Sequence, residues 1–195
     1  MTTASRGTSL IGNSVLDAGK KLKADLDVHS LEELVGSEYI GEWICDWTTS
    51  IEADVTEPKT HYSYSYATQV VTLDDSGKVE NIYAAHDAGK IINPTLFEGQ
   101  LEGSVHMGLG YALSEKFEME GGFPLHTKYG KLGMIRASAT PNIKIIGIEV
   151  PDENGPFGAK GVGEIGLVPT ASAVANAFCQ FSGERQYVLP LKKIK

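Results

Sequence analysis

The chain has 195 residues, of which 42% are hydrophobic and 22% are charged, so it can bury a core and is not expected to be disordered. Its net charge of −8 argues against a nucleic-acid partner, because phosphate binding needs a basic face. No apolar run reaches the roughly 18 residues that cross a bilayer, and the first residues lack the apolar core of a signal peptide. The sequence therefore predicts a cytoplasmic protein that does not enter the membrane.

The first third of the chain predicts two helices and an irregular segment. A helical stripe of apolar residues predicts a helix over residues 8–26. Its candidate N-caps are three hydroxyl residues: Ser5, Thr8 and Ser9. Ser30 and Glu33 have the spacing of a capping box, which predicts a second, short helix over residues 30–35. Residues 37–58, which contain both tryptophans, are expected to be irregular.

From His61 onward the hydrophobic period changes to two. Three tyrosines alternate with small polar residues before the turn sequence of residues 74–77, and residues 79–86 form a second extended stretch, so the pattern predicts a hairpin. The rest of the chain predicts, in order, a helix from Asn93–Pro94 to about Glu115, a strand over 143–150, a Gly- and Pro-rich loop over 151–163, a helix over 169–181 and a last strand over 187–191. Helices and strands alternate irregularly, which favours an α+β fold with a mixed sheet, in one piece over residues 1–195.

The predicted helix that begins at Asn93 is unusually rich in glycine, and each interior glycine costs about 1 kcal/mol relative to alanine. Gly99 and Gly103 share a face, which would let another backbone or a cofactor approach closely. Gln100 lies beside that face, and its amide can exchange hydrogen bonds with a heteroaromatic ring such as a pterin. The alternative is a tightly packed helix pair with Gln100 at the surface, and spacing alone favours this alternative.

The loop GPFGAKGVGE (155–164) is a second candidate site. Its glycines leave backbone N–H groups unshielded, as in an anion-binding nest, and Lys160 adds a positive charge. Glu164 is expected at the mouth of a helix, flanked by Val162 and Ile165. A carboxylate in partly apolar surroundings holds a proton more tightly than one in water and can act as a base near neutral pH. The alternative is an ordinary helix-entry loop whose acid complements the helix dipole, and spacing alone favours it.

Three ordered blocks of the sequence resemble the xanthine dehydrogenase and aldehyde oxidase family. They are TTASR (2–6) with GN (12–13); DAGKIINP (87–94) with GQLEG (99–103) and GLG (108–110); and GAKGVGE (158–164) with PTA (169–171). The resemblance spans nearly the whole chain and is weakest over residues 25–57. It implies the C-terminal part of a molybdopterin-binding subunit, most similar to bacterial xanthine dehydrogenase, and the fold of the corresponding domain.

The resemblance also implies roles for single residues. Glu164 matches the family's catalytic base, and Gln100 matches a glutamine that hydrogen-bonds the pyranopterin. The implied cofactor-binding residues are Ala4, Ser5, Arg6, Gln100, Lys160, Gly161, Val162 and Gly163. The first three match a turn beside the molybdenum and the phosphate end of the cofactor, and residues 160–163 match the loop that presents the base. No protein ligand to the metal is expected.

The implied activity is oxidative hydroxylation of an electron-poor C–H carbon with water as the oxygen source. The substrate that the resemblance implies is a purine such as xanthine or hypoxanthine. The alternatives are an aldehyde oxidase, a nicotinate hydroxylase, a carbon monoxide dehydrogenase-type subunit, or a non-catalytic assembly domain of the same fold. Molybdopterin would serve the complete enzyme, with iron–sulfur clusters and FAD on partner subunits, because two cysteines cannot supply the four thiolates of a cluster. A complete molybdenum subunit of the family is several times longer. We therefore expect a truncated or split-gene product that needs the upstream part of its subunit, forms a homo-oligomer, and is inactive and cofactor-free alone.

Overall fold

The computed structural model describes residues 5–192 and 194, which form two compact units. The helical unit comprises Met1–Ser65, Ala88–Ile91 and Glu149–Gly161. The sheet unit comprises Tyr66–Asp87, Ile92–Ile148 and Val162–Lys195. Within the part of the chain that the structure describes, none of the helices has the length and apolarity needed to cross a membrane.

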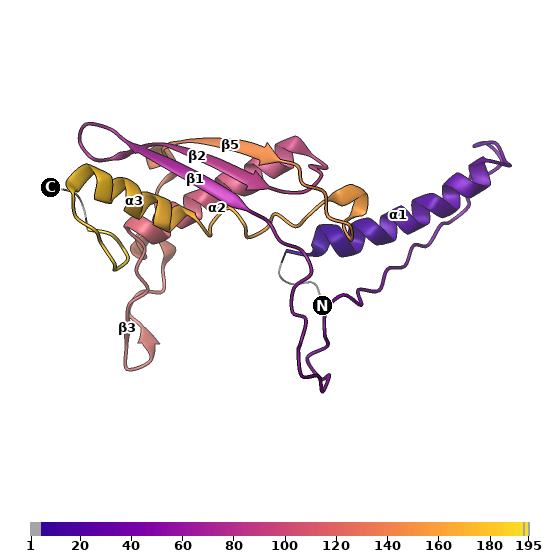
Figure 1. Ribbon diagram of the computed structural model, residues 1–195, viewed down its shortest axis with the longest axis horizontal. Helices are drawn as coiled ribbons and strands as arrows, with labels where there is room; N and C mark the ends of the chain where they lie inside the picture. The colour runs from indigo at the N-terminus through magenta and orange to yellow at the C-terminus, as the bar shows by residue number, and fades with distance from the viewer. Residues whose placement is uncertain (1–4, 193, 195) are drawn as a thin grey trace. The chain divides into compact units, whose positions relative to one another are not determined.

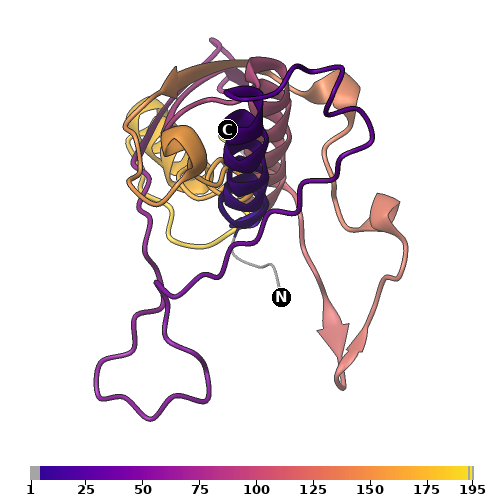
Figure 2. The same ribbon diagram turned by 90° about the vertical axis from the view of Figure 1, so that its right-hand side faces the viewer.

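The sheet unit is a three-stranded mixed sheet covered on one face by two helices (Figures 1 and 2). Strand β1 (Ala67–Leu73) pairs antiparallel with β2 (Val79–Asp87), and β5 (Asn142–Ile148) pairs parallel with the other edge of β2. A parallel pair needs a crossover connection, and α2 (Pro94–Leu113) lies in the connection between β2 and β5. Helix α3 (Thr170–Ser182) packs against α2 and β1. The predicted α+β class with a mixed sheet is confirmed.

The remaining elements are short. In the sheet unit they are β3 (Met119–Glu120), β4 (Phe123–Pro124), η1 (Tyr129–Lys131) and η2 (Ala137–Ala139); in the helical unit, η3 (Pro156–Gly158). Strands β3 and β4 form a small antiparallel hairpin that the sequence pattern did not predict.

The core of the sheet unit lies between the sheet and its two helices. Its buried side chains come from β2, α2, α3 and the C-terminal segment: Val79, Ile82, Ala84, Val105, Leu109, Ala112, Val174, Phe178 and Leu191. Ile82 and Ala84 of β2 face this core because alternate side chains of a strand point to the same face, and Val79 joins them at the register shift opposite Leu73. The predicted helices near 93–115 and 169–181 are both present, and each buries one face in this core.

The predicted hairpin and the start of the following helix are confirmed at the level of single hydrogen bonds. Asp74 closes the turn between β1 and β2, where its Oδ1 accepts from the hydroxyl of Ser76 at 2.6 Å and from the backbone N–H of Lys78 at 3.0 Å. These donors, Ser76 first, hold the pKa of Asp74 below its ordinary value. Asn93 caps α2 by accepting from the N–H of Leu96 at 3.0 Å, with proline in the first turn.

The helical unit contains one long helix, α1 (Gly7–Leu26), close to the predicted bounds. Its N-cap residue is Arg6, and no described side chain caps the helix, so the prediction of Ser5, Thr8 or Ser9 as the cap is wrong. The described residues 27–65 contain turns and bends but no helix or strand, as predicted for most of that segment.

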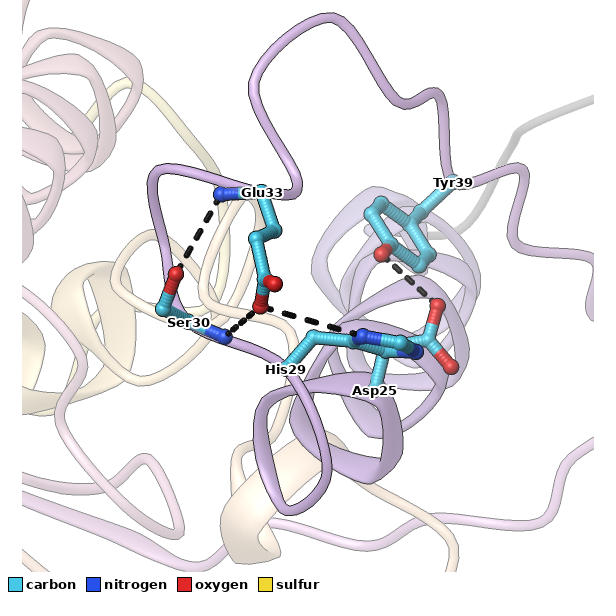
Figure 3. Close-up of polar contacts among 5 residues, drawn as sticks. All are labelled: Asp25, His29, Ser30, Glu33 and Tyr39. Carbon is cyan, nitrogen blue, oxygen red and sulfur yellow. Dashed lines mark hydrogen bonds and ion pairs between the residues drawn. The ribbon is translucent and has the colours of Figure 1, made fainter.

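The capping box of Ser30 and Glu33 forms, but it does not start a helix (Figure 3). The backbone N–H of Ser30 donates to the carboxylate of Glu33 at 2.8 Å, and the N–H of Glu33 donates to the hydroxyl of Ser30 at 3.4 Å. Residues 31–36 are a run of turns held by i to i+3 backbone bonds, so the predicted helix over 30–35 is wrong. With one capping box and few apolar contacts, the segment lacks the packing that stabilises most short helices.

Two predicted strands are also wrong in extent or in kind. Residues 61–66 are not part of β1, which begins only at Ala67, although the N–H of Asp87 still donates to the carbonyl oxygen of Tyr66 at 3.0 Å. Residues 187–191 form no strand; the segment instead docks on α2, where the N–H of Leu191 donates to the carbonyl oxygen of Ala112 at 2.7 Å.

Candidate functional site

The predicted site residues are divided between the two units. Ser5, Arg6, Lys160 and Gly161 belong to the helical unit, whereas Gln100, Val162, Gly163 and Glu164 belong to the sheet unit. Ala4 lies outside the described residues. Each group is therefore described within its own unit.

In the helical unit, the structure brings Gly161 against the turn that precedes α1. A Cβ on Gly161 would lie 2.0 Å from the carbonyl oxygen of Ser5, so only glycine permits this approach. Ser5 itself adopts a left-handed conformation with φ of 58°, which is uncommon for a residue other than glycine. Arg6 follows directly and begins the helix. Residues from two distant blocks of the predicted site thus meet at the backbone.

The loop before Gly161 is tied to the segment after β2. Gly89 and Ala159 form a β-bridge, and the N–H of Lys160 donates to the carbonyl oxygen of Ala88 at 2.9 Å. The side chain of Lys160 is only 8% exposed, and its Nζ donates to the carbonyl oxygen of Tyr64 at 2.9 Å. Lys160 therefore joins three segments of the helical unit.

The loop uses several of its N–H groups internally. The N–H groups of Gly155, Gly158 and Ala159 each donate to the carbonyl oxygen of the residue three positions earlier in the chain, and that of Lys160 donates to the carbonyl oxygen of Ala88. These four groups are committed, so the expectation that this part of the loop forms an anion-binding nest is wrong.

In the sheet unit, Glu164 lies on a segment of bends and turns, residues 162–169, which we call the Glu164 loop. Helix α3 begins only at Thr170, so Glu164 is not at the mouth of a helix as predicted. Its side chain is exposed, so the partly apolar surroundings expected from Val162 and Ile165 do not enclose it. Any enclosure of this carboxylate must come from groups other than its immediate neighbours.

Two glutamine amides hold the Glu164 loop on either side of the acid. The Nε2 of Gln100, from α2, donates to the carbonyl oxygen of Gly163 at 3.0 Å. The Nε2 of Gln69, from β1, donates to the carbonyl oxygen of Gly166 at 2.9 Å, which also accepts from the hydroxyl of Thr170 at 3.1 Å. Gly166 fits closely against α2, since a Cβ there would lie 1.9 Å from the Oγ of Ser104.

Sequence reasoning missed Gln69 and its neighbour His86. The Nε2 of Gln69 lies 3.1 Å from the Nε2 of His86, which is fully buried on β2. Burial lowers the pKa of His86, because the charged imidazolium loses its hydration. One signal was present in the sequence: Gln69 has the same parity as Val71 in β1, so alternation places an amide on the core-facing side of the strand.

The glycines of α2 divide into two groups with different surroundings. A Cβ on Gly99 or Gly103 would meet nothing within 4 Å, so the face beside Gln100 is open. A Cβ on Gly108 would lie 2.7 Å from the Cβ of Thr170, so the close packing of α2 on α3 occurs there. The alternative of a helix pair packed through Gly99 and Gly103 is therefore wrong, although Gln100 is at the surface as that alternative supposed.

An open glycine face beside an exposed amide fits a flat ring system. The amide of Gln100 has a second N–H and a carbonyl oxygen besides the bond to Gly163, and Gly99 and Gly103 put no side chain in the way. The described residues of the sheet unit can therefore accommodate a pterin on this face.

The comparisons with known proteins agree with this chemistry. Residues 1–141 match the model of the molybdopterin cofactor-binding domain family. The chain is 38% identical to the nicotine 6-hydroxylase large subunit of Paenarthrobacter nicotinovorans over 51% of this chain and 12% of that protein. It is 30% identical to the xanthine dehydrogenase molybdenum-binding subunit of Escherichia coli O157:H7 over 58% of this chain and 15% of that protein.

Among solved structures, the aldehyde oxidoreductase of Desulfovibrio gigas matches 97% of this chain and 22% of its own with a TM-score of 0.78 at 28% identity. The chain thus spans 12% to 15% of the length of the two curated relatives. The family match ends before Glu164, whose role rests on its own block of residues. Since the family model covers well over half of the sequence, this chain belongs to the molybdopterin cofactor-binding domain family of the molybdenum hydroxylases.

Proposed function

We propose that this chain forms part of the molybdopterin site of an oxidoreductase that hydroxylates an electron-poor C–H carbon, with Glu164 as the catalytic base. One observation carries the proposal: an exposed carboxylate lies on a loop whose preceding carbonyl is bonded to Gln100, beside the open glycine face of α2. The base and the amide proposed to bind the pterin are thus tied together within the sheet unit.

The chain's own residues would position the cofactor and move one proton. Gln100 would exchange hydrogen bonds with the pterin, and the family resemblance assigns Ser5 and Arg6, whose turn Gly161 approaches, to the phosphate end of the cofactor. When bound, the molybdenum cofactor supplies the two-electron redox step. Glu164 would accept a proton at its carboxylate as the oxygen derived from water becomes nucleophilic. Ala4, Val162 and Gly163 complete the proposed contacts, and Lys160 would act through the position of its loop.

The finer proposal names a purine such as xanthine or hypoxanthine as the substrate. The relatives are named for xanthine, nicotine and aldehyde chemistry, so the competing substrate classes are other nitrogen heterocycles and aldehydes. We further propose that the chain works with the upstream part of a molybdenum subunit in the cytoplasm, with iron–sulfur and FAD-binding partner subunits, in a homo-oligomeric enzyme. Turnover of a panel of purines, nicotine and aldehydes by the complete enzyme would distinguish the substrate classes.

The test of the base is Glu164→Gln in the complete molybdenum subunit. Glutamine keeps the size of the side chain and one acceptor oxygen but cannot take the proton. General-base catalysis contributes on the order of a hundred- to ten-thousandfold, so single-turnover reduction, normalised to molybdenum content, should slow by about that factor. Cofactor content and substrate binding should remain close to wild type.

The matched control is Glu102→Gln, which makes the same change in an exposed acid of α2. Glu102 is expected to affect stability or cofactor retention rather than the chemical step. Reduction of the Glu164→Gln enzyme at close to the wild-type rate would show that Glu164 is not the base.

A further inference from the structure

We propose that Gln69 is a positioning residue: its amide, oriented by His86, holds the Glu164 loop against the sheet. The inference rests on the proposed function, since Glu164 matters only if it is the base. It adds a residue on β1 that none of the three family-like sequence blocks contains.

The hydrogen bonds determine how the amide of Gln69 is oriented. The carbonyl oxygen of Gly166 can only accept, so the amide atom 2.9 Å away must be the nitrogen. The second hydrogen of that nitrogen then points to the Nε2 of His86 at 3.1 Å, which must accept it with a lone pair. His86 is therefore neutral and carries its proton on Nδ1.

Within the described chain, this pair of side chains leaves two polar atoms in the interior without hydrogen-bond partners. The Oε1 of Gln69 and the Nδ1 of His86 are buried, and neither has a hydrogen-bond partner among the residues that the structure describes. Buried polar atoms without partners destabilise a fold, and an apolar pair of similar size would fill the same space without that penalty. What the pair accomplishes instead is the bond to the carbonyl of Gly166, two residues after the proposed base.

The position of the bond explains why both glutamines are needed. Gln100 holds the carbonyl of Gly163 from α2, and Gln69 holds the carbonyl of Gly166 from β1. The two anchors come from different layers of the sheet unit, so the backbone of Glu164 is fixed from both sides. A base must lie within hydrogen-bond reach of the proton that it removes, and a displacement of about 1 Å can cost about a hundredfold in rate.

The experiment compares Gln69→Met with Thr68→Val in the 195-residue chain. Methionine has nearly the shape of glutamine but no donor, and Thr68→Val removes a polar group from the adjacent, exposed position of the same strand. Hydrogen exchange measured by mass spectrometry should show amides of residues 163–168 exchanging about tenfold faster in Gln69→Met, as expected for the loss of one hydrogen bond. Amides of β1, β2 and α3 should keep their protection, and Thr68→Val should match the wild type.

Unchanged exchange in the Glu164 loop would overturn the proposal. So would faster exchange spread evenly through β1, β2 and α3, because Gln69 would then stabilise the fold and not the loop. In the complete subunit, Gln69→Met should lower kcat per molybdenum by about a hundredfold with KM unchanged. The exchange measurement needs neither cofactor nor turnover, so it stands or fails independently of whether Glu164→Gln abolishes the reaction.

Discussion

Burial of His86 makes the stability of the sheet unit depend on pH. The pKa of His86 in the folded protein lies below its ordinary value of 6.5, because burial penalises the charged ring. The pKa of Asp74 in the same unit is held below its ordinary value of 3.8 by the hydroxyl of Ser76 and the N–H of Lys78, so this carboxyl group changes charge only in the acid range. The two contributions are therefore separable.

The free energy of unfolding should fall as the pH drops below about 6.5. In that range the unfolded chain binds a proton at residue 86 while the folded chain resists it, so protonation favours unfolding until the folded pKa is reached. Above 6.5 neither state is protonated and the full contribution remains. Urea unfolding between pH 5 and pH 8 should show this slope in the wild type and a flatter dependence in His86→Gln. Equal slopes in the two proteins would contradict the assignment to His86.

At the level of elements, α2 has one face that packs against α3 and another that is open, and the surroundings of its glycines distinguish the two faces. Gly108 packs against Thr170 of α3, whereas Gly99 and Gly103 face open space. Leu96, on the same side of the helix as these two glycines, is 70% exposed. Glycine lowers helix stability at all three positions, but only at Gly108 does packing within the described chain account for it.

Alanine substitutions in α2 should therefore have opposite effects on stability. Gly99→Ala and Gly103→Ala should each raise the free energy of unfolding of the isolated chain by about 0.5–1 kcal/mol, because alanine is the better helix former and its Cβ meets no atom. Gly108→Ala should lower it by about 1–3 kcal/mol, because its Cβ would overlap Thr170. Urea midpoints at constant m-value would measure both. A destabilising Gly99→Ala would show that the open face is packed after all.

The same glycines should behave differently in the complete subunit. There Gly99→Ala is expected to lower molybdenum content, since a methyl group would stand where we propose that the pterin lies. A protein that becomes more stable and loses its cofactor would show that the glycine is retained for binding.

Local patterns predicted the elements that carry their own signals. The hairpin turn at Asp74, the cap at Asn93 and the period of α1 each depend on residues within a few positions of one another, and each was found. The capping box of Ser30 is the instructive failure, because the local bonds formed without the packing that completes a helix. Local chemistry alone does not make a short helix stable.

The site was predicted in part, for a related reason. The motif that ends at Glu164 and the amide of Gln100 lie in recognisable blocks, and the structure joins them through the carbonyl of Gly163. Gln69 lies 97 positions from Gly166, so no local pattern links the two. The buried position of Lys160 was missed for the same reason, because its partner Tyr64 is 96 residues away. Contacts of this kind depend on the tertiary fold.

At the scale of the whole molecule, both units expose apolar side chains that a soluble monomer would normally cover. In the helical unit, Ile11 and Val15 are four residues apart on α1 and more than 60% exposed. In the sheet unit, Met107 and Tyr111 continue the open face of α2, each more than half exposed. Such exposed apolar surface marks places where another polypeptide packs.

The isolated chain should consequently self-associate, because contacts between copies would remove this apolar surface from water. Sedimentation velocity should show the mean sedimentation coefficient rising with protein concentration. Met107→Glu combined with Tyr111→Glu should weaken the association, since a buried carboxylate without a partner is costly. Thr95→Glu, an exposed change on the same helix, adds charge without removing apolar surface and should have little effect.

A monomer at every concentration would refute self-association. Association unaffected by the double substitution would move the contact to another of the exposed faces, with the stripe of Ile11 and Val15 on α1 as the next surface to alter.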